Sequence, residues 1–366
     1  MGRVRLRHFY CAILLGWLLC LSRLSGYEVL ILGDLHYDAP DLKLNLADLL
    51  DGRKQESKRN FARWEQFIPQ MLEEAGKKSA KCAFAVQLGD LTQGDFCRGN
   101  LHAEALRRAR VAVVDRMECP TYFVKGNHDV RGTDAESAYA KTMLPWLDKQ
   151  FQQVHHGKGT NYALRRKHDL FLFFDCMAPD VAFVEETLAK EKEVRHIFFL
   201  THIPLVPCSN GSPGWILYWR NATERNRLLT LLAKKNVIVL CAHTHAPSYF
   251  VYRFSEGSIR QLVTFSMPAS PAGEFKREDG GGRVKAFLQS DGTGKYPMDA
   301  PSRQLYLDAL RSFEFYSPTG GYAVLHIGET AVEAELFYGN FQESTAKVKL
   351  ALPKKESKPS NPPENK

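Results

Sequence analysis

The sequence predicts an α/β protein, on two observations. Strand-like apolar runs alternate with amphipathic helices along most of the 366 residues, and each of five such runs leads into a short block of Asp, Asn or His. Continuous apolar runs are typical of strands buried on both faces, and open α/β sheets bind ligands beyond the ends of such strands. We therefore expect the polar blocks to lie in one ligand crevice. The five runs are 29–32, 84–88, 121–124, 197–200 and 237–240.

The helices are predicted from the spacing of apolar residues. Residues 61–75 follow a 3.6-residue period, and Pro69 inside them is expected to kink or split the helix. The helix 101–117 joins two of the apolar runs, and a right-handed parallel crossover is the default for this βαβ arrangement. A third helix, 223–235, has Thr223 as its predicted N-cap.

The remaining elements are predicted to be mostly strands. Residues 161–164 and 170–174 flank a polar turn and predict a hairpin. The segment 266–318 is rich in Gly and is expected to consist largely of turns, with one short helix near 304–313. Residues 27–345 contain no internal repeat and no sharp boundary, so we expect a single domain. Four further strands are expected at 249–252, 261–265, 322–327 and 331–337.

The two ends of the chain differ in composition from the predicted domain. In residues 1–26, three arginines precede an apolar run from Phe9 to Leu21, which predicts a cleaved signal peptide. A retained membrane anchor is the alternative, but the run is short for a membrane span and is interrupted near its end by Arg23. Residues 346–366 contain six Lys and two Glu and are expected to form a disordered basic tail. We therefore expect a secreted or periplasmic protein without a stable membrane anchor.

The formal net charge of +8 is concentrated at these two ends. Each end contributes +4, so the residues between them have a net charge of zero. A neutral domain lacks the basic surface that proteins use to bind polyanions. No nucleic-acid polymer is therefore expected as a partner, whereas the oligomeric state cannot be inferred from the sequence.

Six cysteines lie outside the predicted signal peptide, and an even number permits disulfides. Cys82 and Cys119 each begin a predicted strand and could face one another. A disulfide and buried free thiols remain equal alternatives. No pair of Cys or His has zinc-finger spacing, so a structural zinc site is not indicated.

The polar blocks that follow the apolar runs contain residues that bind metal ions. Imidazole, carboxylate and amide groups together suit Mn, Fe or Zn. Two such ions about 3.5–4 Å apart require a bridging carboxylate, for which Asp90 is the candidate. A histidine followed by a carboxylate, beside a metal-binding amide, suits a general acid. The blocks are Asp34-Leu35-His36, Asp90, Gly126-Asn127-His128-Asp129, His202 and His243-Thr244-His245.

In this order the blocks resemble the calcineurin-like metallophosphoesterases, whose pattern is DxH, GD, GNH[DE], an isolated His and GHxH. The resemblance extends from Asp34 to His245. It implies a four-layer α/β/β/α fold, in which two mixed sheets form a β-sandwich flanked by helices within one domain. It also implies two divalent ions that share Asp90. Asp34, His36, Asp90 and His245 would surround one ion, and Asp90, Asn127, His202 and His243 would surround the other.

The resemblance also implies a reaction. A hydroxide bridging the two ions would attack a small phosphomonoester or phosphodiester, His128 would protonate the leaving oxygen, and Asp129 would hold the ring of His128. The segment 266–318 and the loop after His202 are expected to shape the substrate pocket. A non-catalytic binding protein that retains this fold is the alternative, and the complete set of ligands argues against it.

The sequence departs from the family pattern at one position and from one subfamily at another. Ala242 stands where the family usually has Gly, and it could shift the ligands that follow it. The tyrosine that colours purple acid phosphatases is not at the expected spacing. We therefore expect no purple iron centre.

Overall fold

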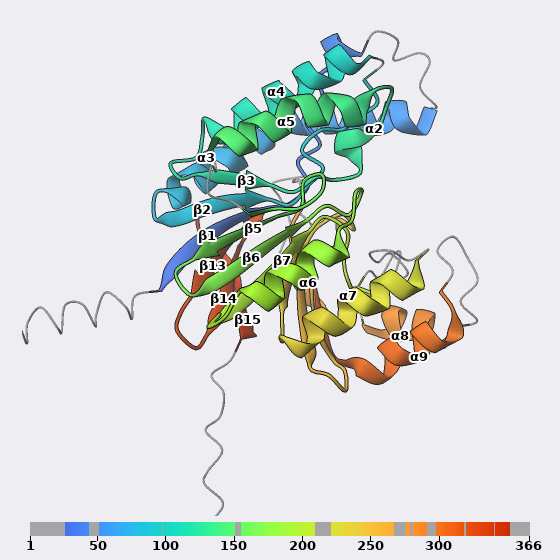
Figure 1. Ribbon diagram of the computed structural model, residues 1–366. Helices are drawn as coiled ribbons and strands as arrows, with labels where there is room; N and C mark the ends of the chain where they lie inside the picture. Colours follow the sequence, from blue (N-terminus) through green and yellow to red (C-terminus); the bar gives the residue numbers. More distant parts are fainter. Residues whose placement is uncertain are drawn as a thin grey trace, which may run out of the picture.

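The computed structural model describes residues 26–43, 51–96, 98–150, 155–208, 221–266, 276–278, 281–290, 298–317, 320–339 and 341–351. Within these residues two sheets pack face to face, and helices cover the outer face of each sheet (Figure 1). This arrangement confirms the predicted α/β fold with two mixed sheets flanked by helices. The predicted signal peptide, the end of the tail and most of the loop after His202 lie outside the described residues.

The first sheet has six strands in the order β15-β14-β13-β1-β2-β3. β1, β2 and β3 run parallel, as the predicted crossover requires, and β13 pairs antiparallel with β1. The mixed character arises because the last three strands return to this sheet from the end of the chain. The strands are β1 (Tyr27–Leu32), β2 (Cys82–Gln87), β3 (Thr121–Phe123), β13 (Tyr322–Ile327), β14 (Val332–Phe337) and β15 (Ser344–Ala351).

The second sheet has nine strands in the order β11-β12-β9-β10-β8-β7-β6-β5-β4. β6, β7, β8 and β10 are parallel, whereas β5 and β6 form the predicted antiparallel hairpin. The strands are β4 (His155–His156), β5 (Tyr162–Arg166), β6 (Asp169–Phe174), β7 (His196–Thr201), β8 (Ile238–Cys241), β9 (Ser248–Arg253), β10 (Ser258–Val263), β11 (Lys276–Glu278) and β12 (Leu310–Ser317).

Helices form the two outer layers. Pro69 splits the first predicted helix, because it occupies the first turn of α3, where its missing N–H is not needed. The predicted N-cap Thr223 is wrong. Asn221 caps α7, and its side chain accepts a hydrogen bond from Glu224 N at 3.2 Å. α2 (Asp51–Gln66), α3 (Ile68–Ser79), α4 (Gly99–Val114) and α5 (Ala135–Gln150) lie on the first sheet; α6 (Val181–Lys190), α7 (Ala222–Lys234), α8 (Gly281–Gln289) and α9 (Ala300–Ala309) lie on the second.

The space between the sheets is filled by apolar side chains from both. Phe84 of β2 and Phe171 of β6 meet edge to face across this layer, with ring centroids 5.0 Å apart. Phe171 also stacks on Phe198 of β7 at 4.6 Å. Separate apolar cores lie beneath the two helical layers. The central strands are thus buried on both faces, which explains why they appear in the sequence as continuous apolar runs.

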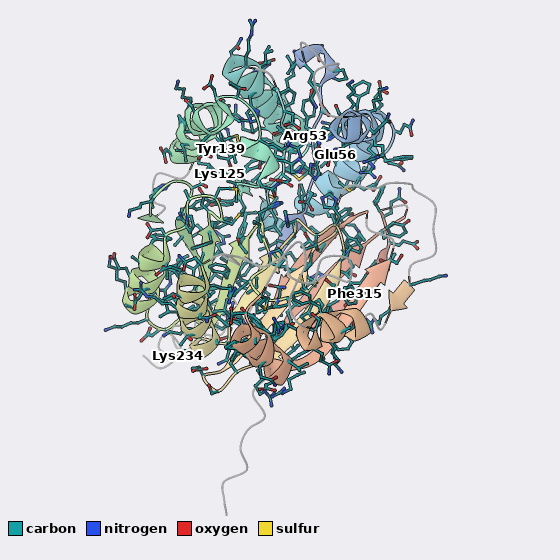
Figure 2. The ribbon with its side chains drawn as sticks, turned by 90° about the vertical axis from the view of Figure 1, so that its right-hand side faces the viewer. Arg53, Glu56, Lys125, Tyr139, Lys234 and Phe315 are labelled. Atoms are coloured by element: carbon teal, nitrogen blue, oxygen red, sulfur yellow. The ribbon has the colours of Figure 1, made fainter. Side chains whose placement is uncertain are left out.

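A buried lysine links the loops that leave the two sheets. Lys125 follows β3, and its Nζ lies 2.7 Å from Asp175 Oδ2, which follows β6. The same ammonium group lies 2.8 Å from Glu136 Oε1 and 5.7 Å from the ring centroid of Tyr139 (Figure 2). Because Asp175 is fully buried, removing Lys125 would leave its carboxylate without a cation in the interior. This pair connects the loop after β3 with the loop after β6.

The segment 266–318 is more regular than its composition suggested. Residues 276–278 and 310–317 form β11 and β12 at the edge of the second sheet, and α8 and α9 cover its outer face. Val284, Leu288 and Tyr306 are buried in the core beneath these helices. The described part of the segment therefore extends the sheet and its helical cover, while a role in shaping the substrate pocket stays a prediction.

The start of the predicted disordered tail is wrong. Residues 346–351 belong to β15, which pairs with β14, and only 352–366 lie outside the described residues. The strand alternates buried Val348 and Leu350 with exposed Lys347 and Lys349. This period-2 pattern is typical of a strand that is buried on one face, whereas the high lysine content alone suggested disorder.

Five cysteines are described as free thiols, so of the two alternatives for Cys82 and Cys119 the structure has free thiols and no disulfide. Burial raises the pKa of Cys119 to about 11 and that of Cys82 to about 12. Both thiols are therefore in the unreactive protonated form near neutral pH. Among the described residues, no helix is long and apolar enough to cross a membrane.

The packing of β15 predicts the effect of truncating Leu350. This side chain is fully buried, so Leu350→Ala is expected to lower the free energy of unfolding by about 2–5 kcal/mol. Lys347→Ala, on the exposed face of the same strand, is the control and should change it by less than about 0.5 kcal/mol. Urea unfolding of both variants gives the comparison. Equal stability of the two variants would show that residues 344–351 do not pack as a strand.

Candidate dinuclear metal centre

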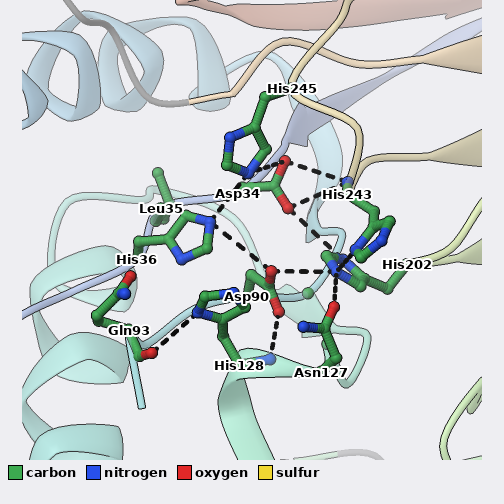
Figure 3. Close-up of polar contacts among 12 residues, drawn as sticks. Asp34, Leu35, His36, Asp90, Gln93, Asn127, His128, His202, His243 and His245 are labelled. Atoms are coloured by element: carbon green, nitrogen blue, oxygen red, sulfur yellow. Dashed lines mark hydrogen bonds and ion pairs between the residues drawn. The ribbon is translucent and has the colours of Figure 1, made fainter. Parts of the chain in front are cut away.

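The predicted ligands come together at the ends of five strands. Asp34 and His36 follow β1, Asp90 follows β2, Asn127 follows β3, His202 follows β7, and His243 and His245 follow β8. The two sheets face each other, so these loops converge at one edge of the sandwich (Figure 3). Three overlapping groups have ligand atoms within 4.8 Å of one another: Asp34, His36 and His245; His36, Asp90 and His128; and Asp90, His202 and His243.

The first group places two imidazole nitrogens against a carboxylate. His36 Nε2 lies 3.0 Å from His245 Nε2, and His245 Nε2 lies 3.8 Å from Asp34 Oδ2. Asp34 also accepts the backbone N–H of His243 at 3.2 Å, which fixes its orientation toward the histidine loop. Nitrogen and oxygen ligands of this kind suit a first-row transition metal ion.

The group of Asp90, His202 and His243 contains a histidine whose orientation is set by the backbone. His202 Nδ1 lies 2.9 Å from the carbonyl oxygen of Leu88, which can only accept, so Nδ1 donates. In the neutral ring, Nε2 therefore carries a lone pair. This nitrogen lies 3.1 Å from Asn127 Oδ1, 3.2 Å from Asp90 Oδ2 and 3.0 Å from His243 Nδ1. A backbone acceptor that fixes the ring in this way is typical of metal-binding histidines.

Asp90 lies between His36 of the first group and His202 of the group just described. Its Oδ2 lies 3.2 Å from His202 Nε2 and 3.7 Å from His36 Nε2, so one oxygen faces both groups. Its Oδ1 accepts the backbone N–H of His128 at 2.7 Å. The side chain is therefore fixed in the place that a bridging carboxylate would occupy. The donor set of carboxylates, imidazoles and an amide fits two divalent ions, because each half supplies converging lone pairs.

Burial and neighbouring charges perturb these groups strongly. Burial raises the pKa of Asp34 and lowers the pKa values of His36 and His243. Burial would also raise the pKa of Asp90, but His202 and His128 outweigh it and hold this pKa well below its usual range. Burial opposes protonation of His202 as well, yet the Asp90 carboxylate raises its pKa to about 9. Buried carboxylates and imidazoles grouped in this way are stabilised by bound cations.

Four of the predicted ligands have strained backbones. His36, Asp90, His243 and His245 have φ values of +43°, +52°, +68° and +52°. This left-handed region costs residues other than glycine of order 1–3 kcal/mol each and is concentrated at functional sites. Ala242, in contrast, does not have positive φ. The substitution of Gly by Ala is therefore tolerated without strain, and the expected displacement of the following ligands has no cause in the backbone.

The loops can approach only because two glycines lack side chains. A Cβ on Gly126 would lie 2.1 Å from Asp90 N and 2.3 Å from Asp90 Oδ1. A Cβ on Gly89, whose φ is +89°, would lie 2.7 Å from His202 Nδ1. These glycines bring the loops after β2, β3 and β7 into contact around Asp90.

The partner predicted for His128 is wrong. The carboxylate of Asp129 accepts the backbone N–H groups of Thr92 and Gly126, each at 2.9 Å, and so is directed away from the ring. Instead, His128 Nδ1 donates to the carbonyl oxygen of Gln93 at 2.9 Å, and Arg131 Nη1 donates to His128 Nε2 at 3.1 Å. Burial and the Asp90 charge raise the pKa of Asp129 to about 7. Asp129 is therefore a residue that joins two loops of the centre.

Three residues near His128 were missed from the sequence. Gln93 contributes a backbone carbonyl, which no sequence motif reveals. His102 Nε2 lies 2.7 Å from the Asp129 carbonyl oxygen and supports the turn that contains His128. Arg131 follows the GNHD block by two residues, and its position alone could have indicated a role in the site.

A comparison with protein families identifies the family of this chain. The profile described as calcineurin-like phosphoesterase matches residues 27–247, more than half of the chain. The chain belongs to the calcineurin-like phosphoesterase family. The match covers all seven predicted ligands as well as His128 and Asp129. None of the curated proteins matches the chain.

Several solved structures are similar in fold to this phosphoesterase. A purple acid phosphatase from yellow lupin (Lupinus luteus) aligns over 90% of this chain with a TM-score of 0.51 and 13% identity. The chain spans only 54% of the length of that enzyme. A dimetal phosphatase from Danio rerio aligns over 89% of this chain and 98% of its own, with a TM-score of 0.51 and 11% identity. At these identities the likeness shows a shared fold.

The close approach at Gly126 predicts the effect of adding one methyl group. Gly126→Ala would push Asp90 away from the other ligands, because the new Cβ would overlap it. We expect the free energy of unfolding to fall by about 1–3 kcal/mol. Bound metal, measured by elemental analysis of protein purified with added Mn, should fall below half of the wild-type value. Gly282→Ala is the control, since a Cβ there meets nothing within 4 Å. Full metal content in Gly126→Ala would contradict the role given to this contact.

Proposed function

We propose that this phosphoesterase is a dinuclear-metal hydrolase that cleaves small phosphomonoesters or phosphodiesters. One observation carries the proposal: six candidate ligands and His128 form three overlapping groups, two of which contain Asp90, and Asn127 Oδ1 lies 3.1 Å from His202 Nε2. Asp34, His36, Asp90 and His245 would hold one divalent ion, and Asp90, Asn127, His202 and His243 the other. Mn, Fe and Zn all suit this donor set. When bound, two such ions would supply an activated water and neutralise charge on the phosphoryl oxygens.

His128 is the general acid in this proposal. Its Nδ1 donates to Gln93, and in the neutral ring Nε2 accepts from Arg131 Nη1, so Nε2 is the nitrogen that would carry the proton passed to the leaving oxygen once a substrate takes the place of that contact. The Asp90 carboxylate accepts the backbone N–H of His128 and fixes the turn that holds the ring. His128 and His36 pack edge to face, with ring centroids 4.5 Å apart. The acid is thus held next to a ligand of the first ion.

The substrate is proposed to be a small phosphate ester, and the protein is proposed to act outside the cytoplasm. The zero net charge of residues 27–345 supports the first statement, because a nucleic-acid polymer requires a basic surface. The composition of residues 1–26 supports the second, because a basic start followed by a short apolar run is typical of a signal peptide.

Two substitutions distinguish the metal centre from the acid. Asp90→Ala should lose both bound metal and activity, with turnover reduced by more than about 10³-fold, because the bridging ligand contributes several kcal/mol. His128→Ala should keep its metal but lose about 10²–10⁴-fold in turnover, because it lacks the acid. The loss should be larger for alkyl phosphates than for aryl phosphates, whose leaving groups need less protonation. Elemental analysis and steady-state kinetics give these values.

The same assay includes its controls. Asp41→Ala removes an exposed carboxylate that pairs with Arg108 and should leave both metal content and turnover unchanged. Chelation of wild-type protein should abolish hydrolysis, and addition of Mn, Fe or Zn should restore it. Wild-type protein without bound metal and without activity on aryl phosphates would support a non-catalytic binding role. Full turnover of Asp90→Ala would reject the assignment of the centre.

Export is tested by the N-terminus of the mature protein. Full-length protein is expected in the extracellular or periplasmic fraction of a secreting host, with its chain beginning close to residue 27. Mass spectrometry of the purified protein measures this boundary. A mature chain that still begins at Met1 and stays in the membrane fraction would indicate a retained anchor.

A further inference from the structure

Arg131 lies at the open side of the candidate centre. Its Nη1 donates to His128 Nε2 at 3.1 Å, and its side chain is 22% exposed. Asp34, His36, Asp90 and His202 are buried on the inner side. The side chain of His245 is 40% exposed, so the centre is open to solvent at His245 as well as beside Arg131. A substrate that reached His128 from solvent would therefore meet Arg131.

Two carboxylates hold the far edge of this guanidinium. Arg131 Nη2 lies 2.7 Å from Asp95 Oδ2 and 3.4 Å from Glu56 Oε2. Arg53 Nη1 lies 2.9 Å from the other oxygen of Asp95. Arg53 and Glu56 lie together in the helical layer above the sheets (Figure 2). The acids occupy Nη2, and Nη1 is left facing the centre.

The backbone fixes the same geometry. Asp95 has a φ of +59°, and its backbone N–H donates to the carbonyl oxygen of Arg131 at 2.7 Å. The preceding Gly94 allows this approach, because a Cβ there would lie 2.5 Å from the carbonyl oxygen of His128. The loop after β2 therefore holds Arg131 in place through a side-chain ion pair and a backbone hydrogen bond. A strained residue with two contacts to one arginine indicates that the position of this arginine matters.

The guanidinium has more donors than acceptors around it. It carries five N–H groups. Its ion pairs and hydrogen bonds go to Asp95, Glu56 and His128, and the buried Nε has no hydrogen-bond partner. One N–H of Nη1 remains on the accessible side, and an oxygen of an anionic group would accept from it. The planar fork of a guanidinium matches phosphate geometry better than an ammonium group does.

We propose that Arg131 contacts a terminal oxygen of the substrate phosphoryl group and makes the enzyme favour phosphomonoesters over phosphodiesters. The inference rests on the proposed function, whose substrate class it narrows. A monoester offers one more terminal oxygen and one more negative charge than a diester, in which a second ester group replaces that acceptor. Arg131 therefore gains a hydrogen-bond partner with a monoester and loses it with a diester. Glu56 and Asp95 are positioning residues that direct Nη1 toward the substrate.

The test compares two substrates that share a leaving group, p-nitrophenyl phosphate and bis(p-nitrophenyl) phosphate, on metal-loaded protein. For Arg131→Met, kcat/KM for the monoester should fall by about 10–100-fold, the value of one hydrogen bond to a charged group. The value for the diester should change by less than about threefold. Binding of inorganic phosphate, measured by calorimetry, should weaken by the same factor as the monoester value, with metal content unchanged.

Further variants distinguish loss of the contact between Arg131 and the substrate from a general disturbance of the site. Arg131→Lys keeps the charge but lacks the planar guanidinium, so its loss in kcat/KM for the monoester should be intermediate. If Arg131→Met does not fold, the comparison is made with Arg131→Lys. Glu56→Gln should raise KM for the monoester and leave kcat nearly constant, because it loosens Arg131 without removing it. Arg107→Met is the control, since Arg107 is an exposed arginine that pairs with Glu104 on α4. It should leave all values unchanged.

The outcomes are distinguishable. Equal losses for monoester and diester would overturn the proposed preference, and unchanged phosphate binding in Arg131→Met would overturn the contact itself. A wild-type protein that hydrolyses neither ester would reject the proposed function. In that case the phosphate measurement still decides whether Arg131 binds a phosphoryl group.

Discussion

The buried carboxylate of Asp90 is the group on which the rest of the centre depends. One of its oxygens faces His202 and His36, and the other accepts the backbone N–H of His128. A carboxylate in this position has no water to solvate it, so histidines or cations must compensate its charge. The neighbouring backbone is built around it: Asp90 itself has positive φ, and Gly126 has no side chain where a Cβ would overlap it. The separation of the two candidate ion sites therefore follows from one residue.

The sandwich supplies the rigidity that this arrangement requires. Strained ligand loops persist only where the surrounding structure fixes their ends. Here the strands that carry them are buried on both faces, between an apolar layer shared by the two sheets and the helical covers. Lys125 and Asp175 add a buried ion pair between the loops of the two sheets. The energy of the strained loops is thus offset by packing that lies outside the centre.

Helix α2 contacts the centre through polar groups instead of apolar packing. Asn60 Nδ2 bonds Gln93, and Trp64 Nε1 donates to the carbonyl oxygen of Leu35 at 2.8 Å. Ser57 donates to Asp38 at 2.6 Å, and the same carboxylate pairs with buried Lys43. With Arg53 and Glu56, this face of the helix reaches the loops after β1, β2 and β3. The polar face of α2 thus supports both the loop that contains Asp34 and His36 and the residues that position His128 and Arg131.

The sequence alone indicated the class of fold and the candidate ligands, because apolar runs and the residues directly after them are local features of the chain, whereas the assignment of the candidates to two ions came from the resemblance to the family. It also indicated the split at Pro69 and the parallel crossover. Only the tertiary structure decided what holds His128, because its partners are a backbone carbonyl from Gln93 and a guanidinium whose direction is set by Asp95 and Glu56. The strand at Ser344–Ala351 needed β14 as a partner before its alternation outweighed its lysine content. Local patterns thus specify which groups are present, whereas contacts between distant segments specify where each group points.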